Sequence, residues 1–167
     1  MRRWMGVAGV ALVLAVSACA TSPEPPQPPP KSVTSAGTWT YAFDAGPGLA
    51  SATLSAADGL PIVRFACKAP DGALLVQDWT FSRARQNGYP ATFTLGARSA
   101  SFAGIVSGDG AGRQALSFQV PAHDAVFADL TPSSPVSTAA AGFTHVWAPG
   151  AASRLNDVLN SCHTAGS

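Results

Sequence analysis

Beyond residue 38, apolar and polar residues alternate along the chain, and turn-forming residues interrupt the alternation at short intervals. A period of two is typical of antiparallel strands, because successive side chains of a strand point to opposite faces of the sheet. The pattern predicts about seven or eight short strands. Their apolar positions are, in chain order, Trp39, Tyr41 and Phe43; Ala50, Ala52, Leu54 and Ala56; Val63, Phe65 and Cys67; the segment 74–81; Phe93, Leu95 and Ala97; the segment 102–106; Leu116, Phe118 and Val120; and Phe143, His145 and Trp147.

Turn and cap signals separate these strands. The segment 69–72 reads Ala-Pro-Asp-Gly, which predicts a tight turn with proline at its second position and glycine at its fourth. Residues 107–112 are rich in glycine and predict the tip of a hairpin. Asp124 is expected to cap a short helical turn that runs to Leu130.

The end of the chain changes period. Leu155, Val158, Leu159 and Cys162 have the spacing of one stripe of an amphipathic helix. The predicted fold is therefore mainly β, a small antiparallel β-sandwich or partly open barrel, with a C-terminal α-helix that covers an open edge or end.

The start of the chain has a different character. Two arginines precede an apolar run over 7–16, which is of signal-peptide length and too short to span a bilayer comfortably. The next segment, Val16-Ser17-Ala18-Cys19, resembles the lipobox of bacterial lipoproteins, in which an aliphatic and two small residues precede a cysteine. The resemblance covers only this export segment, and it implies cleavage before Cys19. An ordinary signal peptide, cut after Ala18, is the alternative.

The same resemblance implies that the Cys19 thiol carries a diacylglycerol and that its amine carries a third, palmitate-like acyl chain. Several chains make an anchor that hardly dissociates, because each buried methylene contributes about 0.8 kcal/mol. The following residue is Ala20 rather than aspartate. In lipoproteins of Gram-negative bacteria this implies the periplasmic face of the outer membrane, with the inner membrane as the alternative.

The segment that follows the lipobox is rich in proline, which favours an extended polyproline conformation. We interpret 1–18 as a signal peptide, 19–38 as a lipidated tether and 39–163 as a β-rich globular domain. A proline-rich ligand for a partner domain is the alternative for the tether.

Composition supports one folded domain, because 47% of the residues are hydrophobic and 11% are charged. The net charge is +1, and loss of both N-terminal arginines would bring it to −1. The remaining cations are scattered along the sequence, so no basic footprint for nucleic acid is present.

With Cys19 lipidated, Cys67 and Cys162 are the two thiols that remain, in a compartment that oxidises them. Both fall on predicted apolar faces, so a disulfide would join the helix to the sheet. In the chain-entropy model a loop of nearly 100 residues is worth at most about 4.7 kcal/mol. Two buried free thiols or a redox pair are the alternatives, although no Cys-x-x-Cys is present.

Motifs for catalysis, cofactors or metals are lacking in the sequence. His123, His145 and His163 are too dispersed for a metal motif, and no Gly-x-Ser-x-Gly or Ser-x-x-Lys occurs. His145 is interpreted as a satisfied, half-buried histidine, and a triad of serine, His123 and Asp124 is disfavoured because adjacent side chains diverge on a strand.

Other candidate features have structural interpretations. The spacing Gly108-x-Gly110-x-Gly112 resembles a phosphate loop but lacks the lysine and the following helix. The aspartates outside the tether fall mostly in turns, where this residue has a local role. Trp39, Trp79 and Trp147 could line a ligand groove, but strand tryptophans are more often core. We assign no catalytic, cofactor-binding or metal-binding residue.

The domain pattern, with one cysteine in mid-chain and another in a terminal helix, is similar to that of small exported proteins of alphaproteobacteria. That similarity implies no activity and no site residues. The leading hypothesis is a non-enzymatic periplasmic module that binds an envelope protein or a small ligand. The alternatives are an envelope enzyme whose site is assembled from distant residues and a carrier of a small apolar ligand.

The lipobox predicts that Cys19→Ser abolishes lipidation and releases the protein from membranes, because the thiol is the acceptor of the first lipid. Fractionation and intact mass spectrometry of the wild type and the variant measure this. An unmodified N-terminus in the wild type, or a wild type as soluble as the variant, would contradict the prediction.

Overall fold

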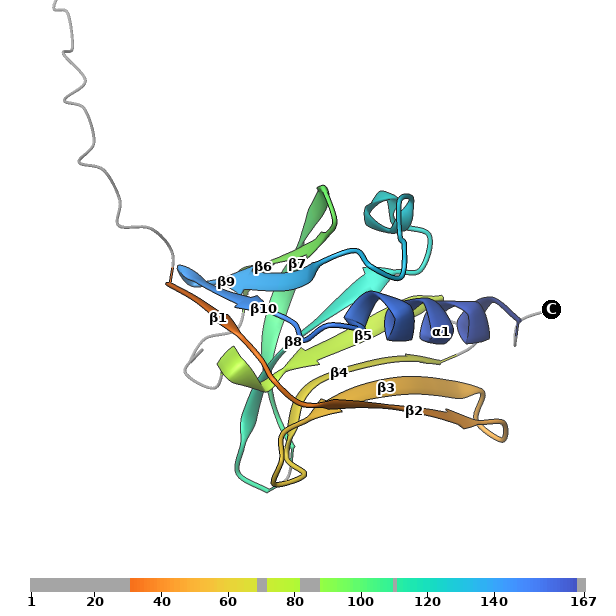
Figure 1. Ribbon diagram of the computed structural model, residues 1–167, viewed down its shortest axis with the longest axis horizontal. Coiled ribbons are helices and arrows are strands. Elements are labelled where there is room, and N and C mark those ends of the chain that lie inside the picture. The colour runs from red at the N-terminus through yellow and green to blue at the C-terminus, as the bar shows by residue number, and fades with distance from the viewer. Residues whose placement is uncertain (1–30, 69–71, 82–87, 110, 165–167) are drawn as a thin grey trace, which may run out of the picture.

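The computed structural model describes residues 31–68, 72–81, 88–109 and 111–164, without the side chains of Lys68 and of 162–164. In these ranges the chain forms a ten-stranded mixed sheet that curls into a half-barrel, with one helix in the hollow of the curl (Figure 1). The predicted class, mainly β with a partly open barrel and a C-terminal helix, is confirmed.

The elements follow one another with short connections. They are β1 (Lys31–Thr34), β2 (Thr38–Asp44), β3 (Leu49–Ser55), β4 (Pro61–Lys68), β5 (Ala73–Asp78), the 3-10 turn η1 (Trp79–Phe81), β6 (Tyr89–Leu95), β7 (Arg98–Gly108), β8 (Gln114–Pro121), the 3-10 turn η2 (Ala125–Phe127), β9 (Val136–Ala140), β10 (Phe143–Val146) and α1 (Ala151–Thr164). The spatial order of strands is β1-β10-β9-β6-β7-β8-β5-β4-β3-β2. Neighbours are antiparallel except β1 and β10, which run parallel.

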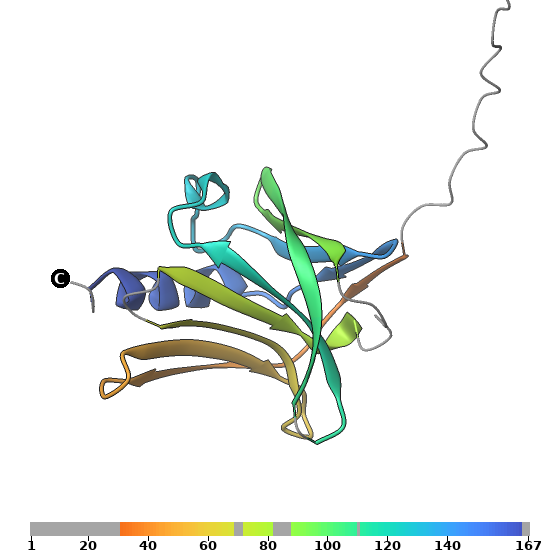
Figure 2. The same ribbon diagram turned by 180° about the vertical axis from the view of Figure 1, so that it is seen from behind.

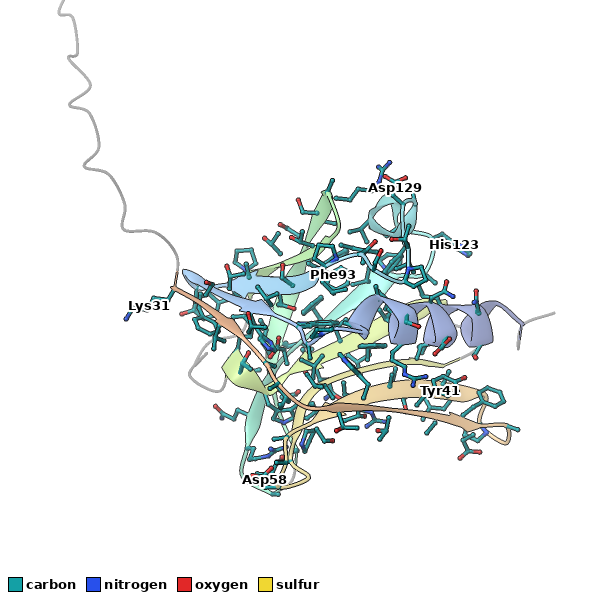
Figure 3. The ribbon with its side chains drawn as sticks, viewed as in Figure 1. Lys31, Tyr41, Asp58, Phe93, His123 and Asp129 are labelled. Atoms are coloured by element: carbon teal, nitrogen blue, oxygen red, sulfur yellow. The ribbon has the colours of Figure 1, made fainter. Side chains whose placement is uncertain are left out.

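The predicted alternation places most of the core correctly, although Ala97 lies in an exposed turn and Ile105 is exposed. In β3 and β5 every second residue is buried, and the buried faces point into the curl. Trp147 lies among aromatic rings there, with centroids 5.7 Å from both Phe65 and Phe93. Trp39 packs on Phe65 at 5.2 Å, so the core role predicted for Trp39 and Trp147 is confirmed. Figure 3 shows Phe93 in this interior and Asp58, His123 and Asp129 at the periphery.

The helix α1 fills the side of the hollow formed by β2, β3 and β4. The predicted stripe is buried at Leu155, Val158 and Leu159, and Ala151 and Ala152 extend it. The stripe member Cys162 lies outside the described side chains. Gly150 precedes the helix with φ of +88°, a left-handed conformation that glycine adopts without a steric penalty.

Two strands of the structure were not predicted from the sequence. The first, β1, lies within the segment interpreted as tether, and all four of its residues are exposed, so no alternation marks it. The second, β9, alternates buried and half-buried residues, but these are small: Val136, Ser137, Thr138, Ala139 and Ala140. Both strands depend on pairing with distant partners, which a local pattern cannot show.

Consecutive strands β1 and β2 lie at opposite edges of the sheet. Only Ser35, Ala36 and Gly37 connect them, a span of about 14 Å at most when fully extended. The edges must therefore approach each other, and this requires the curl, which Figure 2 shows from behind. A Cβ at Gly37 would collide with the carbonyl of Ser55, so the crossing needs a glycine at that point.

The face predicted for β2 holds only in part. Trp39 is packed, whereas Tyr41 and Phe43 are 37% and 48% exposed. The Tyr41 hydroxyl reaches the hydroxyl of Ser161 near the end of α1, at 2.7 Å. The outer half of this edge strand thus extends to the rim of the helix rather than into the core.

These positions bear on the predicted disulfide. Cys67 is 1% exposed on the inner face of β4, against which α1 packs. Cys67 pairs with Ala50 of β3, and Ala50 pairs with Phe43 of β2. Ser161, near the end of α1, contacts Tyr41, which lies two residues before Phe43 on β2. The end of α1 and Cys67 therefore lie on the same side of the sheet, and the disulfide remains a prediction.

We expect Cys162→Ser to lower the free energy of unfolding by several kcal/mol, and by at most about 4.7, because the long loop in the unfolded chain is no longer closed. Chemical denaturation with and without reductant measures the effect. The neighbouring Ser161→Ala serves as control, since it leaves both thiols in place and removes only the hydroxyl contacts with Tyr41 and with the Asp157 carbonyl. Reaction of both thiols with a thiol reagent in non-reducing denaturant would contradict the prediction.

Candidate functional site

Two polar clusters stand out from the apolar packing of the domain. One lies inside the curl and joins Asp78 at the end of β5, His145 on β10 and Ser35 just after β1. The other is an open groove on the outer face of β3, β4 and β5. They are called here the inner relay and the outer groove.

The inner relay is a continuous chain of hydrogen bonds. The Nδ1 atom of His145 donates to Oδ2 of Asp78 at 2.7 Å, since an ionised carboxylate only accepts. Oδ1 of Asp78 accepts from the backbone N–H of Thr80 at 3.0 Å and from its hydroxyl at 2.5 Å. At the other end, the Ser35 hydroxyl contacts Nε2 of His145, which accepts in the neutral tautomer.

The inner relay matters for stability because its charged and polar groups are buried. Asp78 and His145 are both 0% exposed, and a buried carboxylate without partners would be strongly unfavourable. Each carboxylate oxygen and each ring nitrogen has a partner. Because β5 and β10 lie five places apart in the sheet, the bond between their side chains spans the interior of the curl.

The prediction for His145 was half right. The histidine is satisfied, as expected, but it is wholly rather than half buried. Asp78 bonds across the fold, whereas Asp44, Asp58 and Asp124 bond locally in turns and Asp129 forms an exposed ion pair with Arg98. The sequence signal for a buried Asp78 was its place in the alternation, because it falls on the same inward face of β5 as Leu74 and Val76.

The order of atoms in the inner relay is that of a Ser-His-Asp triad. In acyl transfer, however, the histidine Nε2 must also protonate the leaving group, which has to approach that atom. The contact between Ser35 and Nε2 is also present in a resting triad, but His145 has no exposed surface, so a leaving group does not reach Nε2 in this arrangement. The inner relay ties the end of β1 to the core.

A row of polar side chains from three neighbouring strands forms the floor of the outer groove. Thr53 on β3 pairs with Arg64 on β4, which pairs with Gln77 on β5, and all three point away from the core. Ser51 and Trp79 lie beside this row. The hollow measures about 410 Å³ and is lined by Ser51, Thr53, Pro61, Arg64, Gln77, Trp79 and Asp109.

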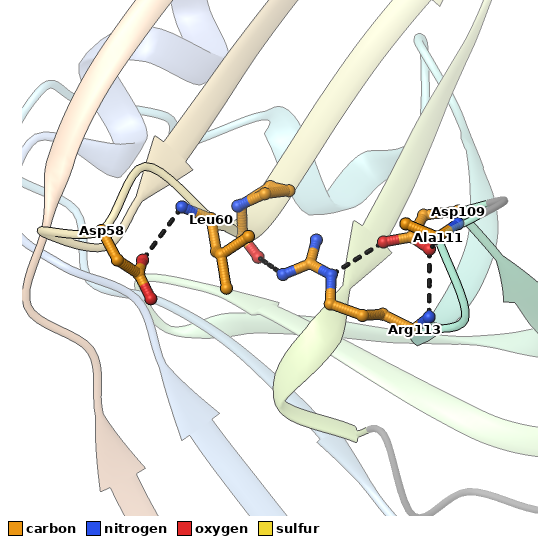
Figure 4. Close-up of polar contacts among 6 residues, drawn as sticks. Asp58, Leu60, Asp109, Ala111 and Arg113 are labelled. Atoms are coloured by element: carbon orange, nitrogen blue, oxygen red, sulfur yellow. Dashed lines mark hydrogen bonds and ion pairs between the residues drawn. The ribbon is translucent and has the colours of Figure 1, made fainter.

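Arg113 fixes one wall of the outer groove (Figure 4). Its Nε donates to Asp109 at 2.7 Å, its NH1 donates to the carbonyl of Pro61 at 3.3 Å, and its guanidinium lies 5.5 Å from the ring centroid of Trp79. The side-chain hydrogen bond from Arg113 holds the pKa of Asp109 below its usual value. Asp109 therefore stays ionised and paired with Arg113 at neutral pH.

Other groups in the outer groove lack such partners. Among the described residues, neither the Arg64 guanidinium nor the Gln77 amide takes part in a hydrogen bond or ion pair. The indole N–H of Trp79 is buried, and it too has no hydrogen-bond partner among the residues that the structure describes. Trp79 thus departs from the predicted core role and follows the groove alternative at this one position.

The remaining predicted features are accounted for locally. Asp124 caps η2 as predicted, and Gly108 and Gly112 lie at the hairpin between β7 and β8. The turn at 69–72 and His163 fall largely outside the described residues. His123 is an exposed residue after β8, and within the described ranges no three acidic, histidine or cysteine side chains gather as a metal site. No helix in those ranges is long and apolar enough to span a membrane.

A second hollow bears on the carrier alternative. It measures about 430 Å³ and lies beside Thr34, Val146 and Trp147, with several prolines along its wall. Thr34 and Val146 point to the face opposite the inner relay, because side chains alternate along each strand. The hollow is open at the surface, whereas the core around the tryptophans is filled by aromatic contacts.

Comparison with known proteins adds no assignment: no family model matches the chain, and neither curated proteins nor solved structures match it.

The inner relay predicts that Asp78→Ala lowers the free energy of unfolding by about 3–5 kcal/mol, because His145 and Thr80 lose a buried partner. Thr138→Val is the matched control: Thr138 is equally buried and pairs with His145, but its hydroxyl has no described partner. This control should change stability by less than about 1 kcal/mol. Equal effects of both variants in urea denaturation would refute the role given to the relay.

Proposed function

We propose that the protein is a lipid-anchored module of the bacterial envelope that binds a small polar ligand in the outer groove, without catalysing a reaction. The outer groove is the observation that carries the proposal. It holds a guanidinium and an amide without partners in the described chain, beside the ring of Trp79 and a wall fixed by Arg113. Groups of this kind bind and orient a ligand, and no nucleophile with an adjacent base lies among them.

The anchoring half of the proposal rests on the sequence at Cys19 and on the proline-rich segment that follows it. We infer attachment to the outer membrane, facing the periplasm, with the inner membrane as the alternative. A tethered domain needs a firm attachment point where the tether enters the fold. The parallel pairing of β1 with β10 and the bond between Ser35 and His145 are suited to that role.

A photo-crosslinking amino acid at Gln77 tests the binding function whatever the identity of the ligand. We expect adducts in living cells from this position, because the side chain lines the outer groove. The same amino acid at Ser99, an exposed residue at the opposite end of β7 from the groove, is the control and should give none. Absence of adducts at Gln77, or equal adducts at both positions, would contradict a binding role for the groove.

An enzyme assembled from distant residues is the second candidate, and the atom order of the inner relay is the one observation that favours it. In such an enzyme Ser35 would be the nucleophile and a fluorophosphonate probe would label it. The proposal above expects no label in the wild type. Labelling that is lost in Ser35→Ala would instead establish the hydrolase.

A further inference from the structure

We infer that the ligand of the outer groove is an acidic saccharide, a sugar that carries a carboxylate on its ring. The inference rests on the proposed binding function and names the class of ligand. It follows from three properties of the groove: one guanidinium without a partner, neighbouring amide and hydroxyl groups, and an indole ring held at the wall.

Arg64 supplies the recognition of charge. It lies in the middle of the row formed with Thr53 and Gln77, and no carboxylate of the described chain pairs with it. Asp109, the acidic residue in the lining, is committed to Arg113 and to two backbone N–H groups. A guanidinium in this position favours a carboxylate, which it can bind through two parallel hydrogen bonds.

The groups around Arg64 suit the hydroxyls of a sugar ring. Gln77 offers both a donor and an acceptor, and the hydroxyls of Ser51 and Thr53 offer both as well. Spacing is regular, because directly paired strand residues lie about 5 Å apart. Such a row can form several hydrogen bonds with the hydroxyls of a pyranose, whereas a purely apolar ligand would leave all of these groups unpaired.

Trp79 supplies the apolar contact. An indole presents a flat surface for the C–H face of a sugar, and Trp79 lines the outer groove while its N–H is buried. The Arg113 guanidinium lies near the ring and is itself fixed by Asp109 and Pro61, so the wall is organised in advance. Organisation before binding reduces the entropy lost on association.

The form of the hollow agrees with this class. About 410 Å³ lies in the roughly 300–1,000 Å³ range of small-molecule sites, and the hollow is an open groove rather than an enclosed cavity. An extended saccharide can pass through an open groove with one or two rings in contact. An acidic peptide would also offer a carboxylate but would lack the flat hydroxylated face of a sugar. The experiment below therefore compares an acidic peptide with the acidic saccharide.

Titration of the full chain, purified from membranes in detergent, tests the inference with three probes: a galacturonic acid tetramer, the neutral galactose tetramer and a tetraglutamate peptide. Calorimetry gives the dissociation constant, and the indole fluorescence reports contact with Trp79. We expect the acidic saccharide to bind at least tenfold more tightly than either other probe. Equal binding of the two sugars, or tighter binding of the peptide, would overturn the inference.

Variants locate the binding. Arg64→Gln should reduce the affinity for the acidic tetramer at least tenfold and so remove its advantage over the neutral tetramer. Trp79→Leu should reduce the affinity for both tetramers. Arg98→Gln is the control: this arginine forms an exposed ion pair with Asp129 and should bind as the wild type does. Circular dichroism checks that each variant is folded, and Gln77→Ala provides a further groove variant if one is not.

The two proposals fail in different ways. Adducts at Gln77 in cells together with no saccharide binding would overturn the acidic saccharide and leave the binding function in place. Saccharide binding that persists unchanged in Arg64→Gln and Trp79→Leu would overturn the assignment to the outer groove.

Discussion

The buried hydrogen bond between Asp78 and His145 holds together parts of the sheet that are far apart in its strand order. Five strand positions separate β5 from β10, yet the two side chains meet at 2.7 Å inside the curl. The three-residue crossing from β1 to β2 brings the sheet edges near each other, and the inner relay fixes the inside of the same curve. A flatter sheet would separate these partners and leave a carboxylate buried without compensation.

The inner relay and the outer groove are linked through one strand. At the end of β5, Asp78 points inward to His145, while Gln77 and Trp79 on either side of it point outward into the outer groove. Because alternate residues of a strand face opposite sides, the bond that fixes Asp78 also fixes the backbone that carries two groove residues. A rigid interior network thus positions the side chains proposed to contact the ligand.

The sequence allowed the class of fold, most strand faces and the terminal helix to be predicted, because these depend on local periodicity. Phe65, Phe118 and Leu155 are buried where the pattern placed them. The clusters could not be predicted in the same way. Asp78 and His145 are 67 residues apart, and Arg64 meets Gln77 only through strand pairing. The strand β1 was missed for a related reason, since its pairing with β10 joins opposite ends of the chain.

Hydrogen exchange of the backbone amides in the wild type and in Ser35→Ala measures most directly whether the inner relay holds the first strand on the sheet. Removal of the hydroxyl leaves the pairing of β3 with β4 intact but releases the end of β1 from His145. The amides of β1 and the Ser35 amide that bonds to Val146 should exchange about tenfold faster, with β3 and β4 unchanged. Unaltered protection of β1, or equal acceleration throughout the sheet, would contradict this account.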